Sequence, residues 1–284
     1  MSLKFASLLV SAAFIIGGAH GALAADLFGD SMKDGPLSYA PMSEPGPSIY
    51  FRIDGGYSAY DDPDLTENAV LDLTNPGIDN SWSLGGGVGM TLGGGFRGDL
   101  TYEHRFEADV SGNVLDVSND IPGTRQFGFE SDVFLANLYY DFDFGSRFTP
   151  YLGVGVGVAL NKTTDGSVDD PCGCLTGTIE GDETTDVAAA FMAGLSVKLR
   201  GGEQTVGSFK DGPISVDTGR GLFLDVGYRF LYLGETATGP VTATYTANNP
   251  SNGHLAGDVE VSQDAKVDDI HAHELRVGLR YNVN

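Results

Sequence analysis

Histidines beside carboxylates are the residues of this chain that come nearest to an acid–base or acyl-transfer site. His104 follows Glu103, and His271 and His273 precede Glu274. A histidine base needs a nucleophile within hydrogen-bond reach and a third group that orients it. The stretch around the last two histidines, DDIHAHE, contains no serine, and no partner can be assigned to His104. We therefore expect no enzymatic activity and no catalytic residue.

The two cysteines, Cys172 and Cys174, are separated by one residue in the sequence PCGC. In an oxidising compartment they could form a disulfide with each other, although one intervening residue makes a tight ring. They lack the C-x-x-C spacing of a redox motif and the second pair of ligands that a zinc site needs. We expect a cross-link within a loop or free thiols, with no metal and no cofactor.

Charged side chains in regular alternation are the more informative feature. Between Phe96 and Phe106 the apolar side chains occupy one parity, while Arg97, Asp99 and Glu103 occupy the other. Because successive side chains of a strand point to opposite faces, this period of two predicts a β-strand. Seven other segments show the same alternation, which gives the set 49–60, 82–92, 96–106, 133–144, 152–160, 187–199, 222–232 and 274–282.

The connections between these segments alternate in length. Residues 93–95 and 145–148 are short connections, whereas 200–220 is long where a short turn is expected. The other connections are long: 61–80, 107–130, 162–184 and 234–268. Outer-membrane barrels have short periplasmic turns, long external loops and aromatic residues at both bilayer surfaces. The sequence therefore predicts an all-β fold, an eight-stranded antiparallel up-and-down transmembrane β-barrel, with both termini in the periplasm.

The chain divides into three parts. Residues 1–24 have a positive start at Lys4, an uncharged apolar run and small residues at Ala22 and Ala24, which is typical of a secretory signal peptide. Residues 25–48 are rich in Gly, Pro and Ser and are predicted to be a flexible periplasmic tail. Residues 49–284 are predicted to form the outer-membrane barrel with long external loops.

The charged faces of the segments predict a lumen filled with paired charges. The inward-facing set holds equal numbers of bases and acids: Arg52, Asp54, Arg97, Asp99, Glu103, Arg105, Asp141, Asp143, Lys198, Asp225, Arg229, Glu274, Arg276 and Arg280. The interior of an eight-stranded barrel is just wide enough for side chains to fill, and unpaired buried charges are costly. We expect a salt-bridged plug, with a narrow porin-like channel for ions or small solutes as the alternative.

The chain is strongly acidic, with a formal net charge of −23, and most of the acids lie in the four long connections. Such a charge excludes electrostatic binding to nucleic acid. We expect a solvated acidic surface facing outward, where it meets outer-membrane lipids and the anionic lipopolysaccharide.

The final segment carries a recognisable pattern, since Leu275, Val277, Leu279 and Tyr281 alternate with polar residues. Together with the strand pattern of residues 49–284, this ending resembles the OmpA-like and OmpX-like eight-stranded outer-membrane barrels. It is most similar to the surface-antigen barrels, or porin family, of the alphaproteobacteria. The resemblance implies that these four residues belong to an assembly signal that the barrel-assembly machinery reads. The chain departs from the family by ending in NVN and not in an aromatic residue.

The resemblance also implies a structural role in the integrity of the cell envelope and a surface that is exposed to the outside. In related barrels an Ala-Asp mature terminus is an acceptor for covalent linkage to peptidoglycan, so Ala25 and Asp26 are candidate attachment residues. Some small barrels modify lipid A, which makes a lipid A-modifying enzyme the remote alternative.

An eight-residue stretch occurs twice, as SMKDGPLS at residues 31–38 (Ser31–Ser38) and SFKDGPIS at residues 208–215 (Ser208–Ser215). The predicted topology places both copies in the periplasm. We hypothesise that they form a docking element for a periplasmic partner or pair with each other. The alternative is two similar Gly-Pro turns.

Overall fold

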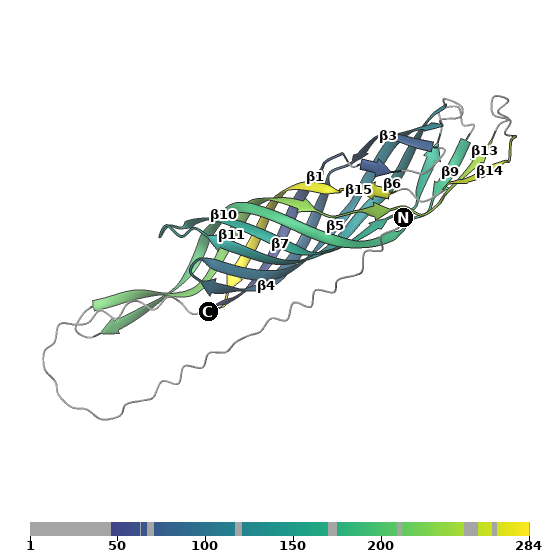
Figure 1. Cartoon of the computed structure of the whole chain (residues 1–284). Helices are drawn as coiled ribbons and strands as arrows, with labels where there is room; N and C mark the ends of the chain where they lie inside the picture. The colour runs from purple at the N-terminus through teal and green to yellow at the C-terminus, as the bar shows by residue number, and fades with distance from the viewer. Residues whose placement is uncertain are drawn as a thin grey trace, which may run out of the picture. The chain divides into compact units, whose positions relative to one another are not determined.

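The computed structural model describes residues 47–62, 64–66, 71–116, 121–169, 175–208, 212–246, 255–262 and 266–283 (Figure 1). The predicted signal peptide, Ala25, Asp26, Cys172, Cys174 and almost all of the predicted tail lie outside these residues. In the described part of the chain, no helix is long and apolar enough to cross a membrane.

Eight long strands of the described chain close into a barrel (Figure 1). They are β1 (Ile49–Tyr60), β4 (Ser81–Gly93), β5 (Phe96–Asp116), β6 (Ile121–Asp141), β7 (Phe148–Thr163), β10 (Glu183–Ser208), β11 (Gly212–Tyr232) and β16 (His271–Asn282). Every neighbouring pair is antiparallel, and the pairing of β1 with β16 closes the ring. The predicted all-β, eight-stranded, antiparallel up-and-down barrel is confirmed.

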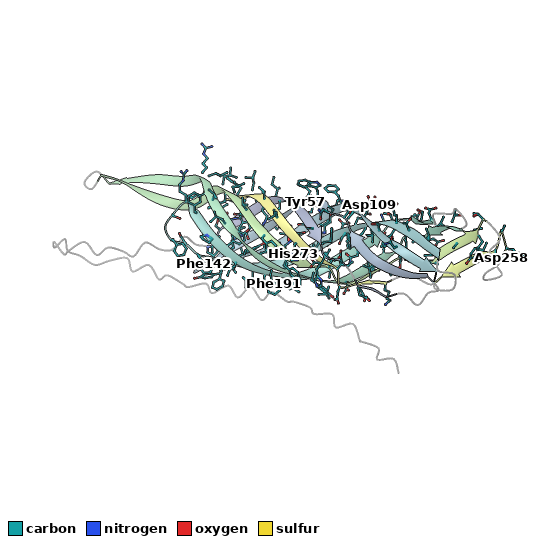
Figure 2. The ribbon with its side chains drawn as sticks, turned by 90° about the horizontal axis from the view of Figure 1, so that it is seen from above. Tyr57, Asp109, Phe142, Phe191, Asp258 and His273 are labelled. Atoms are coloured by element: carbon teal, nitrogen blue, oxygen red, sulfur yellow. The ribbon has the colours of Figure 1, made fainter. Side chains whose placement is uncertain are left out.

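The two faces of the wall explain why these sequences form a barrel. Along β1, exposed Phe51 and Ile53 alternate with buried Arg52 and Asp54. The same alternation leaves a continuous apolar outer surface, and Figure 2 shows side chains such as Tyr57 and Phe191 on the outside of the ribbon. A closed barrel satisfies every backbone hydrogen bond between its strands, which is what a bilayer requires. The apolar outside and charged inside are therefore the faces of a membrane-spanning wall.

Two ends of the barrel differ, and we name them by their connections. At the turn end, β4 and β5 are joined through Gly93, Gly94 and Gly95, with φ angles of 86°, 60° and 84°. This left-handed conformation is accessible to glycine at little cost, which is why three glycines form this tight turn. The opposite end, where the connections 61–80, 107–130, 162–184 and 234–268 lie, is the loop end.

The predicted long loops are largely β-structure, which corrects the sequence-based bounds. β5 and β6 stay paired as far as Asp116 and Ile121, whereas the sequence placed a loop at 107–130. Short strands fill the other connections: β2 (Asp64–Thr66), β3 (Leu71–Ile78), β8 (Gly166–Asp169), β9 (Leu175–Ile179), β12 (Thr236–Ala237), β13 (Val241–Tyr245), β14 (Val259–Ser262) and β15 (Lys266–Asp268). We call the part of the structure built by these strands and the outer halves of β5 and β6 the extension.

An apolar core explains why the extension is ordered. Beyond a register shift between Arg105 and Ala108, the inward positions of β5 and β6 are taken by apolar side chains that are each at least 95% buried: Ala108, Val110, Phe127 and Phe129. They belong to one cluster with inward side chains of the barrel and with side chains of β3, β8, β9 and β13. Burial of these side chains supplies the driving force that holds the strands together beyond the membrane-spanning wall.

The long connection at 200–220 is a hairpin, and this corrects the expectation of an extended turn. β10 and β11 pair from Glu203 with Asp217 to Ser208 with Gly212, after register shifts next to Lys198 and Gly201. The second copy of the repeat therefore begins at the tip of this hairpin. The first copy lies outside the described residues, so pairing between the copies stays a prediction.

Candidate functional site

The interior of the barrel holds a dense cluster of arginines and glutamates at mid-height. Arg105 and Glu103 come from β5, Arg229 from β11, and Glu274 and Arg276 from β16. Arg229 Nη2 lies 2.5 Å from Glu103 Oε1, and Arg105 Nη1 lies 3.2 Å from the same oxygen. Glu274 accepts from Arg105 and Arg229, while Arg276 donates to Glu103. Three cations thus share two carboxylates, and we call this set the central cluster.

Hydroxyl groups complete the central cluster. Ser58 donates to Glu274 at 3.0 Å, and Arg105 Nη2 donates to the Tyr60 hydroxyl at 2.9 Å. Arg105 and Glu274 are almost completely buried. Charges removed from water in this way are tolerated only when ion pairs and hydrogen bonds satisfy them, which the cluster provides.

A second group of charges lies nearer the turn end. Arg52 donates to Asp54 at 2.6 Å, to Asp99 at 2.9 Å and to the Tyr139 hydroxyl at 2.9 Å. Asp99 also accepts from Tyr50 at 3.0 Å and from Asn137 at 2.8 Å. The charged side chains of this group are therefore paired with one another, whereas Asn137 Oδ1 is buried without a hydrogen-bond partner among the described residues.

Two further ion pairs lie beside the opening at the turn end. Arg97 Nε donates to Asp141 at 3.0 Å, and its guanidinium lies over the ring of Tyr139, 4.0 Å from the centroid. Arg280 Nε donates to Asp225 at 3.0 Å and lies over the ring of Phe223 at 4.4 Å. Stacking on aromatic faces stabilises a guanidinium that is removed from water.

The structure brings together all but two of the residues that the sequence assigned to the lumen. Asp143 is a correction: it is exposed in the turn after β6, where its carboxylate accepts the Gly145 amide at 2.8 Å. The reason is that β6 ends at Asp141, so inward parity no longer applies. Lys198 is half-buried on β10 and also makes an interaction, so it is not a free charge.

Apolar side chains fill the interior between the central cluster and the loop end. Going from Arg229 and Glu274 towards the loop end, the inward positions become Leu231, Leu233 and Ala272, all fully buried. Three more apolar side chains are buried in this part of the interior, Val133 and Leu135 from β6 and Ala190 from β10. The charged interior is thus followed by a mainly apolar layer that holds the uncharged pair Ser131 and Asn161, with Asn161 donating to the carbonyl of Leu233 at 2.8 Å, and we call this layer the apolar seal.

The turn end, in contrast, is open. A cavity of about 680 Å³ reaches into the barrel there, and we call it the vestibule. Its lining includes Asp141, Asp143, Arg147, Lys198, Phe223 and Arg280. The vestibule gives the interior polar access from the turn end, whereas the apolar seal closes the loop end.

Comparison with known families decides what kind of barrel this is. The profile of the outer membrane protein beta-barrel domain matches residues 40–230, which is more than half of the chain. The chain belongs to this family. The outward-facing apolar wall therefore lies in a bacterial outer membrane. A search of curated proteins finds no significant match.

Several solved structures of outer-membrane proteins align with this chain at low similarity. Neisserial surface protein A (NspA) is 17% identical with a TM-score of 0.40, and the match covers 84% of this chain and 99% of that one. Ail, the attachment invasion locus protein of Yersinia pestis, is 10% identical with a TM-score of 0.33 over 84% and 99%. The outer membrane protease OmpT from Escherichia coli is 8% identical with a TM-score of 0.41 over 87% and 99%. These values are too low to transfer an activity.

On the outer wall of this outer-membrane barrel, the histidines have cross-strand partners that the sequence did not give. His104 Nδ1 lies 2.9 Å from Asp132, which also accepts from Tyr102 at 2.8 Å. His273 lies 2.5 Å from the Tyr228 hydroxyl and 3.2 Å from Asp61. The two histidine side chains are 38% and 43% exposed. Their hydrogen bonds go to tyrosine and aspartate, so the described contacts do not place a serine or thiol nucleophile on either ring.

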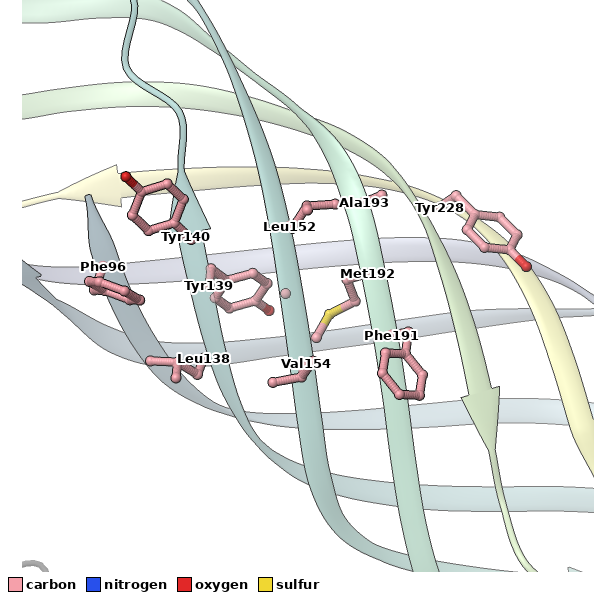
Figure 3. A pocket seen from close by; sticks show the side chains of 11 residues that line it. Phe96, Leu138, Tyr139, Tyr140, Leu152, Val154, Phe191, Met192, Ala193 and Tyr228 are labelled. Atoms are coloured by element: carbon pink, nitrogen blue, oxygen red, sulfur yellow. The ribbon is translucent and has the colours of Figure 1, made fainter. Parts of the chain in front are cut away.

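An apolar groove of about 450 Å³ runs along the wall between β6, β7 and β10 (Figure 3). Leu138, Val154 and Phe191 line it (Figure 3), together with Gly153. The hydroxyl of Tyr139, the buried polar group beside it, is bonded to Arg52. The groove therefore presents a mainly apolar surface to the bilayer, with Tyr140 and Tyr228 also in its lining.

The residues of the predicted assembly signal lie on the same outer wall. Leu275, Val277, Leu279 and Tyr281 all face outward from β16 and are at least 40% exposed. β16 pairs with both β1 and β11, so it is the strand that closes the barrel. Recognition of this strand by the barrel-assembly machinery stays a prediction.

Proposed function

We propose that the protein is a closed, non-conducting barrel that presents a folded acidic extension at the cell surface and contributes to envelope integrity. The observation that carries this proposal is the apolar seal above a central cluster in which charged groups are paired. A conducting pore requires a hydrated path of polar groups from end to end. The interior described here changes from charged to uncharged and mainly apolar side chains at Leu231, Leu233 and Ala272, which opposes the alternative of a narrow channel.

The proposal places the loop end outside the cell and the turn end in the periplasm. Short turns face the periplasm and long connections face outward in outer-membrane barrels, which supports this orientation. The extension would then present its acids, such as Asp109, Glu180 and Asp258, to the surroundings of the cell. A non-catalytic surface role fits an extension with this charge and the histidine contacts described above.

Surface labelling tests the orientation. In a variant without the native cysteines, we expect Val259→Cys to react with a membrane-impermeant maleimide in intact cells, because Val259 is 60% exposed on β14. The matched variant Ser146→Cys, exposed at the turn end, should react only after the outer membrane is permeabilised. Labelling of Ser146→Cys but not Val259→Cys in intact cells would contradict the proposed orientation.

We further propose that the barrel is tethered to peptidoglycan through Ala25, the first residue of the predicted mature chain. Ser48, which precedes β1, lines the vestibule, so the chain enters the barrel at the end proposed to face the periplasm. Mass spectrometry of peptides from detergent-washed sacculi tests this. We expect a peptide that begins at Ala25 and carries a muropeptide, and recovery of only a free terminus at Ala25 would oppose the tether.

A further inference from the structure

The vestibule has the dimensions and lining of a ligand site, although the proposed function does not use it. Its volume of about 680 Å³ lies within the range of small-molecule pockets, roughly 300–1,000 Å³. The wall combines charged groups with the hydroxyls of Thr91, Ser146 and Thr149 and the ring of Phe223. Such a mixture of apolar surface and a few polar groups is typical of sites that orient a small ligand.

Buried ion pairs hold part of the lining of the vestibule. Arg280 is held by Asp225 at 3.0 Å, and Ser196 donates to the same aspartate at 2.5 Å. Arg97 is held by Asp141, and both Arg97 and Asp225 are at least 95% buried. These ion pairs therefore hold two side chains that line the vestibule, Arg280 and Asp141, in place.

Two cations are brought together at the rim by the fold. The backbone amide of Lys198 on β10 donates to the carbonyl of Arg147 at 2.9 Å, so these two residues from different elements are neighbours. Both line the vestibule, together with Asp143 from the same turn as Arg147. In a chain with a net charge of −23, a lining with three bases (Arg147, Lys198 and Arg280) and two acids (Asp141 and Asp143) is a local reversal of sign.

This arrangement suits a ligand that carries both a carboxylate and an amino group. A guanidinium and an ammonium bind a carboxylate through charge-assisted hydrogen bonds. The carboxylate of Asp143 can accept from an amino group and repels a purely anionic phosphate. Phe223 and the hydroxyls offer contacts to a peptide chain or a sugar.

We propose that the vestibule binds the carboxylate end of peptidoglycan stem peptides. This inference rests on the proposed orientation, because only a periplasmic turn end meets the cell wall. Arg147 and Lys198 would hold the carboxylate, and Asp143 would hold the amino group. The barrel would then contact the wall non-covalently at a site separate from the proposed attachment at Ala25.

Titration of the full-length barrel in phosphatidylcholine nanodiscs tests the inference. The probe is the disaccharide tetrapeptide that a muramidase releases from peptidoglycan. Isothermal titration calorimetry measures its binding to the barrel. We expect saturable binding that weakens about tenfold or more in Arg147→Gln/Lys198→Gln, because two charge-assisted contacts are lost. The matched control is Arg200→Gln, an exposed arginine at the same end that does not line the cavity, and it should bind like the wild type. The heat-modified gel shift of each variant verifies that its barrel is folded.

Three outcomes would overturn the inference. They are no binding by the wild type at millimolar probe, equal weakening by Arg200→Gln, and displacement of the probe by inorganic phosphate or by phosphatidylglycerol in the nanodisc. The last result would assign the rim to phosphate groups. Because a conducting barrel would leave this titration unchanged, failure of the inference and failure of the proposed closed barrel are distinguishable.

Discussion

Glu274→Gln is expected to destabilise the barrel by about 3–5 kcal/mol, because it leaves buried arginines without their charge partner. Glu274 accepts from both Arg105 and Arg229, and it is 1% exposed. Glutamine keeps the shape of the side chain but removes its charge. Glu103 would then be the remaining carboxylate for the three cations of the central cluster.

Urea unfolding of the barrel refolded into lipid vesicles measures this effect. The matched control is Glu183→Gln, which removes the same charge at an exposed position on the loop side of β10. We expect the control to stay within about 0.5 kcal/mol of the wild type. Equal stability of Glu274→Gln and the control would mean that the central cluster contributes no net stability.

Phe129→Ala is expected to cost about 3–5 kcal/mol, because it opens a cavity in the core shared by the barrel and the extension. Phe129 is 1% exposed, and its ring meets that of Tyr60 edge-on with centroids 6.1 Å apart. Tyr60 in turn accepts a hydrogen bond from Arg105. Loss of the phenyl ring should therefore loosen the extension and the apolar seal together.

Proteolysis of intact proteoliposomes, alongside urea unfolding, measures this second effect. We expect Phe129→Ala to be cut in the extension more rapidly than the wild type. Leu255→Ala serves as the control, because Leu255 is 60% exposed in the same extension, and it should behave like the wild type. An extension that is cut equally fast in both variants would show that its strands do not depend on this core.

The barrel could be predicted from the sequence because period-two alternation depends only on the order of residues along each strand. The extension was missed because its strands were assigned to loops by their charge and length. The apolar pairs Ala108 and Val110, and Phe127 and Phe129, are each two residues apart and could have indicated these strands. Strands beyond the membrane need an apolar core of their own. The connections that supply this core are set by contacts between residues far apart in the sequence.

The sequence predicted which kinds of charged side chain fill the lumen. It did not predict which of them form ion pairs with each other. Parity shows which side chains face inward, but the partners of Arg52 or Glu103 depend on the register and shear of the closed barrel. The roles of Tyr50, Tyr60 and Tyr139 were missed for the same reason, since their hydroxyls meet charges from other strands. Asp143 was misplaced because parity gives no signal for the end of a strand.

The conductance of the purified protein in planar bilayers tests the closed barrel most directly. The central cluster and the apolar seal, with Leu231, Leu233 and Ala272 at its base, predict no sustained current at either polarity. A porin prepared in the same way would verify that the bilayers report insertion, and the heat-modified gel shift would verify that the sample is folded. Absence of current from folded, inserted protein is the predicted result. Reproducible single-channel steps of constant size would contradict the account.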